Sequence, residues 1–224
     1  MSISNNLTQI KSQLPANVTL VAVSKTKPVA DLMEAYNAGQ RIFGENYVQE
    51  LVEKNEQMPK DIQWHFIGHL QSRKVKLITP FVSLIHGVDS LKLLQEINKQ
   101  ADKNNRVIDC LLQIHIAEEE SKFGLDEQEL NEILKQVQND NENYKNTRIV
   151  GLMGMATFTE NQNQIEKEFQ NLKSIFDKVS QLSTENCQLN TLSMGMSGDY
   201  QLAISCGSTM VRIGSSIFGA RNYQ

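Results

Sequence analysis

The sequence has few of the features that mark secreted, membrane or nucleic-acid-binding proteins. Its three cysteines, Cys110, Cys187 and Cys206, are an odd number without CxxC spacing or nearby histidines, which argues against a disulfide framework and a structural zinc site. No stretch approaches the ~20 apolar residues that cross a bilayer, and the amino terminus has no basic segment followed by an apolar run. A formal net charge of -4 argues against a cationic surface for DNA or RNA. We therefore expect a reduced, cytoplasmic protein that binds neither nucleic acid nor a membrane.

Residues that mark a linker between domains are also scarce. There are only 4 prolines in 224 residues, and no stretch is rich in proline, glycine or serine. The asparagine-rich segment 139–146 is typical of a solvated loop rather than of a domain boundary. We therefore expect residues 1–224 to form a single domain.

Short apolar segments of strand type alternate with segments of helical period along the whole chain. The expected strands are 18–25, a segment around Ile42, 64–68, 83–90, 107–115, 148–155, 189–197 and 208–219. An additional helix is expected at the amino terminus, where Ile3, Leu7, Ile10 and Leu14 form one stripe. Eight strands that alternate with helices predict a closed parallel (β/α)8 TIM barrel, an α/β fold. An open doubly wound sheet fits less well, because no GxGxxG follows the first strand.

Polar residues stand where the first expected strand ends, at Ser24, Lys25 and Thr26. In a TIM barrel the functional groups lie at the carboxyl ends of the strands. Desolvation of a lysine at such a position favours the neutral amine that a Schiff base requires. The position of Lys25 alone does not distinguish a Schiff-base lysine from a surface lysine whose ammonium group extends into water. Lys27 competes for the role, but Pro28 follows it directly and places it in the loop.

The ends of the seventh and eighth expected strands carry small residues and hydroxyls. Ser197 follows the seventh strand, and Gly214 and Ser215 follow the eighth. Backbone N–H groups and helix starts in these two loops commonly bind phosphate in barrels of this kind. Each serine alone could instead be a helix N-cap. Together with a lysine at a strand end, the loops favour a phosphorylated ligand that bears an aldehyde.

Five motifs together resemble one known family. VAVSKTKP, FGENYVQE, WHFIGHLQ, LSMGMSGD and VRIGSSIFG, spread from Val21 to Gly219, resemble the YggS/PROSC family of pyridoxal phosphate homeostasis proteins. This family is similar in fold to the barrel domain of alanine racemase, the type III fold of pyridoxal phosphate (PLP) proteins. The resemblance implies that the chain binds PLP and takes part in vitamin B6 homeostasis.

The resemblance also implies roles for individual residues. Lys25 is implied as the internal-aldimine lysine, and Asn46 as a polar contact to the cofactor. Asn46 could equally be an N-cap of the following helix. Met194 and its neighbours are implied to wall the ring. The implied phosphate ligands are Ser197, Gly214 and Ser215.

Arg212 is implied to face the pyridine nitrogen of the cofactor. A guanidinium only donates hydrogen bonds, so the nitrogen that faces it must be an unprotonated acceptor. An unprotonated ring withdraws electrons less strongly than one paired with a carboxylate. This arrangement suits holding the cofactor more than driving demanding chemistry on it.

We therefore expect a PLP carrier, with no catalytic residues, no metal site and no robust turnover. It would act as a monomer and hand PLP to apoenzymes. One alternative is a small PLP-dependent racemase that takes a second base from His65, His69 or His115. The other is a cofactor-free aldolase that forms a Schiff base through Lys25. An open outer face of the cofactor, without a positioned base, favours the carrier.

Overall fold

The computed structural model describes residues 2–118, 123–181, 183–184 and 186–220. Its strands are β1 (Thr19–Val23), β2 (Ile42–Glu45), β3 (Gln63–Phe66), β4 (Leu84–Val88), β5 (Ile108–Gln113), β6 (Thr147–Met153), β7 (Ser183–Thr184), β8 (Cys187–Met196) and β9 (Met210–Ile213). Its α-helices are α1 (Ile3–Gln13), α2 (Val29–Asn37), α3 (Val48–Gln57), α4 (Val75–Ile78), α5 (Leu91–Lys103), α6 (Glu127–Asn139), α7 (Gln162–Val179), α8 (Tyr200–Ser205) and α9 (Ser215–Phe218).

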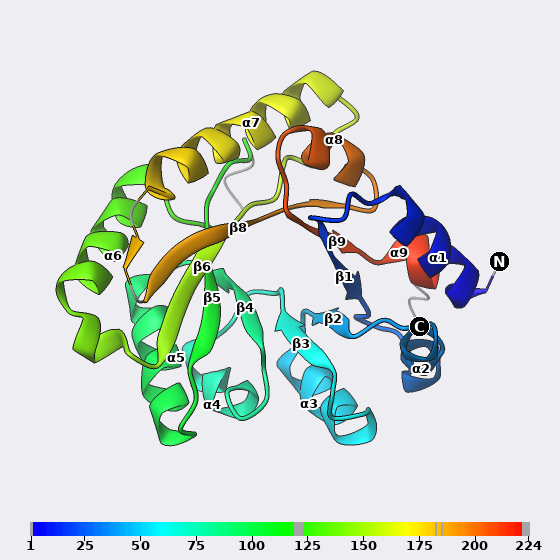
Figure 1. Ribbon diagram of the computed structural model, residues 1–224, viewed down its shortest axis with the longest axis horizontal. Coiled ribbons are helices and arrows are strands. Elements are labelled where there is room, and N and C mark those ends of the chain that lie inside the picture. The colour runs from blue at the N-terminus through cyan, green and yellow to red at the C-terminus, as the bar shows by residue number, and fades with distance from the viewer. Residues whose placement is uncertain (1, 119–122, 182, 185, 221–224) are drawn as a thin grey trace.

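The strands close into a parallel barrel surrounded by helices (Figure 1). The strand order is β6-β5-β4-β3-β2-β1-β9-β8, and β8 also pairs with β6, which closes the circle. The amino-terminal helix α1 packs beside α2 and α9, on the outside of β1 and β9 (Figure 1). The expected (β/α)8 barrel with an additional amino-terminal helix is therefore confirmed.

The expected strands agree with the structure except at their ends and at one addition. The eight expected segments overlap β1 to β6, β8 and β9, although β3, β6 and β8 begin one or two residues earlier than expected. The last strand ends at Ile213, and α9 follows shortly after. The sequence did not predict β7, a two-residue strand that pairs antiparallel with the start of β8. A 3-10 helix, Asn141–Tyr144, lies within the segment expected to be a solvated loop.

The apolar core has two layers, one on each side of the barrel wall. The larger layer packs between the strands and the surrounding helices and includes Phe43, Trp64 and Phe169. The smaller layer lies inside the barrel, where Val21, Leu84, Leu111, Met153 and Met210 are buried. Among the described helices, none is both long enough and apolar enough to cross a membrane. The strands are thus held from both faces, and their carboxyl ends are held in fixed positions.

Candidate functional site

A cavity of about 320 Å³ opens at the carboxyl ends of the barrel strands. It is lined by Val23, Lys25, Lys27, Asn46, Ile67, Met155, Phe158, Met196, Ser197, Gly198, Arg212, Gly214, Ser215 and Gly219. All the site residues expected from the sequence are among them except Met194. Clefts of about 610 and 420 Å³ exist elsewhere, but no described residue that lines them is a lysine. The 320 Å³ cavity is therefore our candidate site.

Lys25 lies in a tight turn directly after β1. The backbone N–H of Lys27 donates to the carbonyl oxygen of Ser24 at 3.1 Å, so Lys25 and Thr26 are the two central residues of the turn. Thr26 has a φ of 63°, which is the left-handed region. Lys27 also lines the cavity, and its Nζ donates to the carbonyl oxygen of Ala220 at 2.8 Å. Two amines therefore reach this cavity, and the Lys27 amine is bonded to a backbone carbonyl of the carboxyl-terminal segment.

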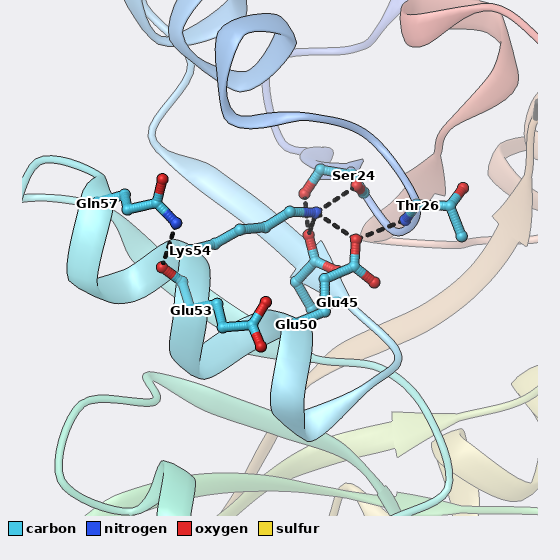
Figure 2. Close-up of polar contacts among 7 residues, drawn as sticks. All are labelled: Ser24, Thr26, Glu45, Glu50, Glu53, Lys54 and Gln57. Carbon is cyan, nitrogen blue, oxygen red and sulfur yellow. Dashed lines mark hydrogen bonds and ion pairs between the residues drawn. The ribbon is translucent and has the colours of Figure 1, made fainter.

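A buried ionic cluster lies directly behind this turn (Figure 2). Nζ of Lys54, on α3, donates to Oε1 of Glu45 at 2.7 Å and to Oε1 of Glu50 at 2.6 Å. The Lys54 side chain is 5% exposed and that of Glu45 is 0% exposed. Burial raises the pKa of Glu45 to about 7, although the ammonium of Lys54 and the hydroxyl of Ser24 act in the opposite direction. Charged groups are rarely buried in this way without a specific reason.

Arg212, on β9, is buried and holds its guanidinium against the barrel wall. Nη1 donates to the carbonyl oxygen of Ser193 at 2.9 Å and to the Ser193 hydroxyl at 2.6 Å, and Nη2 donates to the carbonyl oxygen of Gly154 at 3.0 Å. Burial lowers the pKa of Arg212 to about 10, so the group stays protonated at neutral pH. It therefore presents a fixed donor to the cavity.

Two buried histidines continue this hydrogen-bonded chain into the barrel. Nδ1 of His86 lies 3.2 Å from the Ser193 hydroxyl, and Nε2 of His86 lies 3.0 Å from Nδ1 of His65. Burial lowers the pKa of His65 to about 3 and that of His86 well below its ordinary value. Both rings are therefore neutral at physiological pH, and Arg212 has neutral groups behind it.

Asn46 follows β2 and is not a helix cap. Helix α3 begins at Val48, and Tyr47 is its N-cap residue. The Oδ1 atom of Asn46 is buried without a hydrogen-bond partner, although the residue lines the cavity. A Cβ on Gly68 would lie 2.4 Å from the Asn46 carbonyl oxygen, so only glycine permits this close approach. The Asn46 amide therefore has an acceptor available for a ligand.

The two serine-containing loops meet at the cavity. The backbone N–H of Gly214 donates to the Ser197 hydroxyl oxygen at 3.2 Å, which ties the loop after β8 to the loop after β9. Neither serine caps a helix, because the N-cap residues of α8 and α9 are Asp199 and Gly214. Ser215 is the first residue of α9 and lines the cavity. Ser197 and Ser215 thus line the same cavity, and their role as phosphate ligands stays a prediction.

The expected position of Met194 is wrong, because its side chain does not line the cavity. Met194 is 0% exposed and belongs to the core layer that packs against the helices. Gly195 has a φ of 97°, and the pairing of β8 with β9 changes register between Ser193 and Met196. This irregularity directs Met196 to the cavity instead. The sequence also did not identify Ile67, Met155 and Phe158 as lining residues, because apolar residues near strand ends look like ordinary core.

The histidines considered as second bases do not line the cavity. His65 is buried in the barrel interior, and His69 is an exposed residue that pairs with Asp89 at 3.2 Å and stacks on Phe123. His115 contributes to a different, smaller pocket. In the described part of the chain, no group of three metal-ligating side chains is placed to hold a metal ion.

Comparison with known proteins places the chain in a family. The family model described as alanine racemase, N-terminal domain, matches residues 1–222. The pyridoxal phosphate homeostasis protein of Haemophilus influenzae is 40% identical over 100% of this chain and 98% of its own length. That of Schizosaccharomyces pombe is 44% identical over 92% of this chain and 85% of its own length. The chain belongs to the family of pyridoxal phosphate homeostasis proteins.

A solved member of this family has the same fold. PipY from Synechococcus elongatus is 34% identical, with coverage of 97% of this chain and 100% of PipY. The TM-score is 0.91 for PipY without PLP and 0.88 for PipY with PLP bound. The family resemblance seen in the five sequence motifs is therefore confirmed over nearly the full chain.

Proposed function

We propose that this chain binds pyridoxal 5'-phosphate in the 320 Å³ cavity and serves in the homeostasis of that cofactor. Membership of the family and the PLP-bound structure of PipY support this proposal. The observation that carries it for this chain is one cavity that gathers the Lys25 amine, the hydroxyls of Ser197 and Ser215, and the Arg212 guanidinium. These are the groups that an aldehyde, a phosphate and a pyridine nitrogen require.

The residues present fit this cofactor. Asn46 lines the cavity, and its buried Oδ1 has no hydrogen-bond partner; such an atom is costly unless a ligand or water meets it. The apolar side chains of Val23, Ile67 and Met196 supply walls for a flat ring. A cavity of about 320 Å³ is also within the usual range for small-molecule sites.

Each group would have a distinct task. PLP supplies an aldehyde, which forms a carbon–nitrogen double bond with a primary amine and releases water. Lys25 would provide that amine, and Ser197, Gly214 and Ser215 would hold the phosphate through hydroxyl and backbone donors. Arg212 would donate to the ring nitrogen and keep it unprotonated. The residues thus bind and orient the cofactor while weakening it as an electron sink.

Absorption spectroscopy tests the binding site. We expect the purified protein to be yellow, and borohydride reduction followed by peptide mapping to place the label on Lys25. Lys25→Ala should abolish the covalent link and retain part of the phosphate affinity, since the two contacts are chemically separate. A label on Lys27, or no label on the chain, would contradict the assignment.

We further propose that the chain carries the cofactor rather than turning over a substrate. Apart from Lys25 and Lys27, the described side chains that line the cavity include no candidate general base, and Lys27 is bonded to Ala220. Racemisation requires an acid or base on each face of the substrate. Exchange of amino-acid α-hydrogens with deuterated solvent tests this. Exchange at ordinary enzyme rates of ~1–1000 per second would support the racemase instead.

Transfer of PLP to apoenzymes is also part of the proposal. Three aromatic side chains, Tyr47, Phe123 and Phe158, are exposed on loops at the carboxyl end of the barrel, and Phe158 is 95% exposed. Exposed apolar side chains of this kind suit transient contact with a protein partner. The PLP-loaded protein should reactivate a PLP-dependent apoenzyme faster than PLP alone does, when both solutions contain the same concentration of unbound PLP. Equal rates would contradict direct transfer.

We propose that the protein acts as a monomer in the cytoplasm. All three cysteines are free in the structure, which suits a reducing compartment. Light scattering after size exclusion should give the 25.4 kDa mass of one chain. Cell fractionation with a cytoplasmic marker tests the location.

A further inference from the structure

Both neighbours of Lys25 in the sequence are bonded to the ionic cluster of Glu45, Glu50 and Lys54. Nζ of Lys54 donates to the carbonyl oxygen of Ser24 at 2.7 Å, and the Ser24 hydroxyl donates to Oε1 of Glu45 at 2.6 Å. On the other side, the backbone N–H of Thr26 donates to Oε1 of Glu50 at 2.6 Å. Figure 2 shows these contacts converging on the turn from α3 and β2.

Thr26 has a backbone conformation that needs such support. A φ of 63° is rare for a residue with a β-branched side chain and persists where the surroundings determine it. The side chain of Thr26 is exposed, so packing does not supply that support. The charge-assisted bond from its N–H to Glu50 therefore helps to fix the turn.

The cluster is also an expensive way to stabilise a fold. The side chains of Lys54 and Glu45 are nearly or fully buried, and one carboxylate oxygen of Glu45, Oε2, has no hydrogen-bond partner. Apolar side chains of similar size often stabilise such a position equally well. The energetic cost of burying these charges is understandable if they fix a geometry. Oε1 of Glu45 and Oε1 of Glu50 each accept one hydrogen bond from Lys54 and one from a residue next to Lys25.

We propose that Glu45, Glu50 and Lys54 are positioning residues for the Lys25 amine. By holding the carbonyl of Ser24 and the N–H of Thr26, they fix the direction in which the Lys25 side chain leaves the backbone. A preorganised amine binds its partner more tightly, because less conformational freedom is lost on binding. This inference rests on the proposed function, in which Lys25 is the amine that meets the PLP aldehyde.

The test compares Glu50→Ala with Glu53→Ala. Both residues lie on α3, but Glu53 is exposed and its side chain makes none of the contacts drawn within the cluster (Figure 2). Glu50→Ala removes the acceptor of the Thr26 N–H and leaves Lys54 paired with Glu45, so the fold keeps a compensated ion pair. We expect Glu50→Ala to weaken PLP binding at least tenfold, measured by absorbance titration, and Glu53→Ala to stay within twofold of wild type.

Two further variants separate positioning from folding. Glu50→Gln retains a carbonyl oxygen that can accept from Thr26, and we expect it to recover part of the lost affinity. Lys54→Met combined with Glu45→Gln removes both buried charges, and we expect it to lose affinity even at an unchanged melting temperature. If Glu50→Ala and the double variant both bind PLP within twofold of Glu53→Ala, the inference is overturned. The inference is also overturned if Glu50→Ala loses affinity only in proportion to its lowered melting temperature and Glu50→Gln recovers none of that affinity.

A readout without PLP distinguishes this inference from the proposed function. Reductive methylation with formaldehyde and a borohydride reagent labels amines, and mass spectrometry resolves Lys25 from Lys27. We expect the labelling rate of Lys25 to change at least threefold in Glu50→Ala and not in Glu53→Ala. If the wild type fails to capture PLP on Lys25 but this difference appears, the proposed function fails and the positioning role stands. If no difference appears, the positioning role fails whatever the result with PLP.

Discussion

The guanidinium of Arg212 and the hydroxyl of Ser193 lie 2.6 Å apart inside the barrel, and the same guanidinium nitrogen also donates to the Ser193 carbonyl. Ser193 is fully buried, and Arg212 is 4% exposed. This pair links the cavity to the two neutral histidines behind it. The orientation of the donor that faces the ligand therefore depends on Ser193 together with the Gly154 carbonyl oxygen.

Ser193→Ala should destabilise the protein and disturb the environment of the bound ring. The change leaves both Nη1 of Arg212 and Nδ1 of His86 short of a partner, and an unsatisfied buried polar group costs about 1–3 kcal/mol. Urea unfolding measures the free-energy change, and the absorption maximum of the PLP-loaded protein reports on the ring. Ser205→Ala, at an exposed hydroxyl on α8, is the control and should change neither. An unchanged unfolding free energy in Ser193→Ala would contradict the role of this contact.

Glu45 should make the stability of the cofactor-free protein depend on pH. Its pKa is about 7 in the folded protein against an ordinary value of 4.5, because burial outweighs Lys54 on α3 and Ser24, which follows β1, while Glu50 adds to the rise. Between these values the folded state binds more protons than the unfolded state. The contribution of Glu45 to the unfolding free energy is therefore fully present below pH 4.5 and is lost as pH rises through 7.

The measurement is the unfolding free energy of wild type minus that of Glu45→Gln across this range. We expect the difference to fall by on the order of 3 kcal/mol between pH 4.5 and pH 7. Glu53→Gln, which removes a carboxylate outside the cluster, serves as the control. A difference that stays constant or grows with pH would show that Glu45 is not protonated in the folded protein near neutrality.

Gly68→Ala should weaken ligand binding through Asn46. The new Cβ would lie 2.4 Å from the Asn46 carbonyl oxygen and 2.9 Å from its Cα, so the backbone of one loop must move. We expect a destabilisation of about 1–3 kcal/mol, typical of overpacking, and at least a tenfold weaker affinity for PLP. Gly198→Ala is the control for stability, because its Cβ would meet nothing within 4 Å. Retention of wild-type stability by Gly68→Ala would contradict this reasoning.

Residues 1–224 should unfold in one transition, since we propose that they form a single domain. Trp64 is the single tryptophan and is buried in the core, so its fluorescence reports on tertiary structure. Circular dichroism reports on the helices around the barrel. The two urea curves should coincide for a cooperative domain. Separate midpoints would indicate two independently folding parts.

Much of the architecture was predictable because its signals are local. Apolar runs bounded by polar residues marked all eight barrel strands, and the helical stripes between them implied parallel crossovers. The two-residue strand β7 carries no such signal, because its pairing depends on a turn and on the neighbouring start of β8. Strand ends could be placed only approximately, as the last strand shows.

The candidate site was predictable where a residue type is unusual for its position. A lysine at a strand end and two serine-containing loops indicated a binding site, and in the structure they line one cavity. Met194 was implied by the family resemblance alone; it lies in the core layer that packs against the helices, and the left-handed Gly195 separates its face from that of Met196. Lys54 was missed because a charged residue on an amphipathic helix usually faces solvent. Its burial follows from contacts with Ser24, which follows β1, and with Glu45 on β2, and the sequence of α3 does not contain these residues.

The neutral chain behind Arg212 has a consequence for how an anionic ligand arrives. The rings of His86 and His65 behind this guanidinium carry no charge at physiological pH, and the carboxylate of Asp199 acts on it electrostatically. Asp199 reduces the positive charge only in part, and the surrounding low-dielectric wall directs the remaining field outward through the cavity opening. Capture of a phosphorylated compound should consequently be faster in dilute buffer than in concentrated salt.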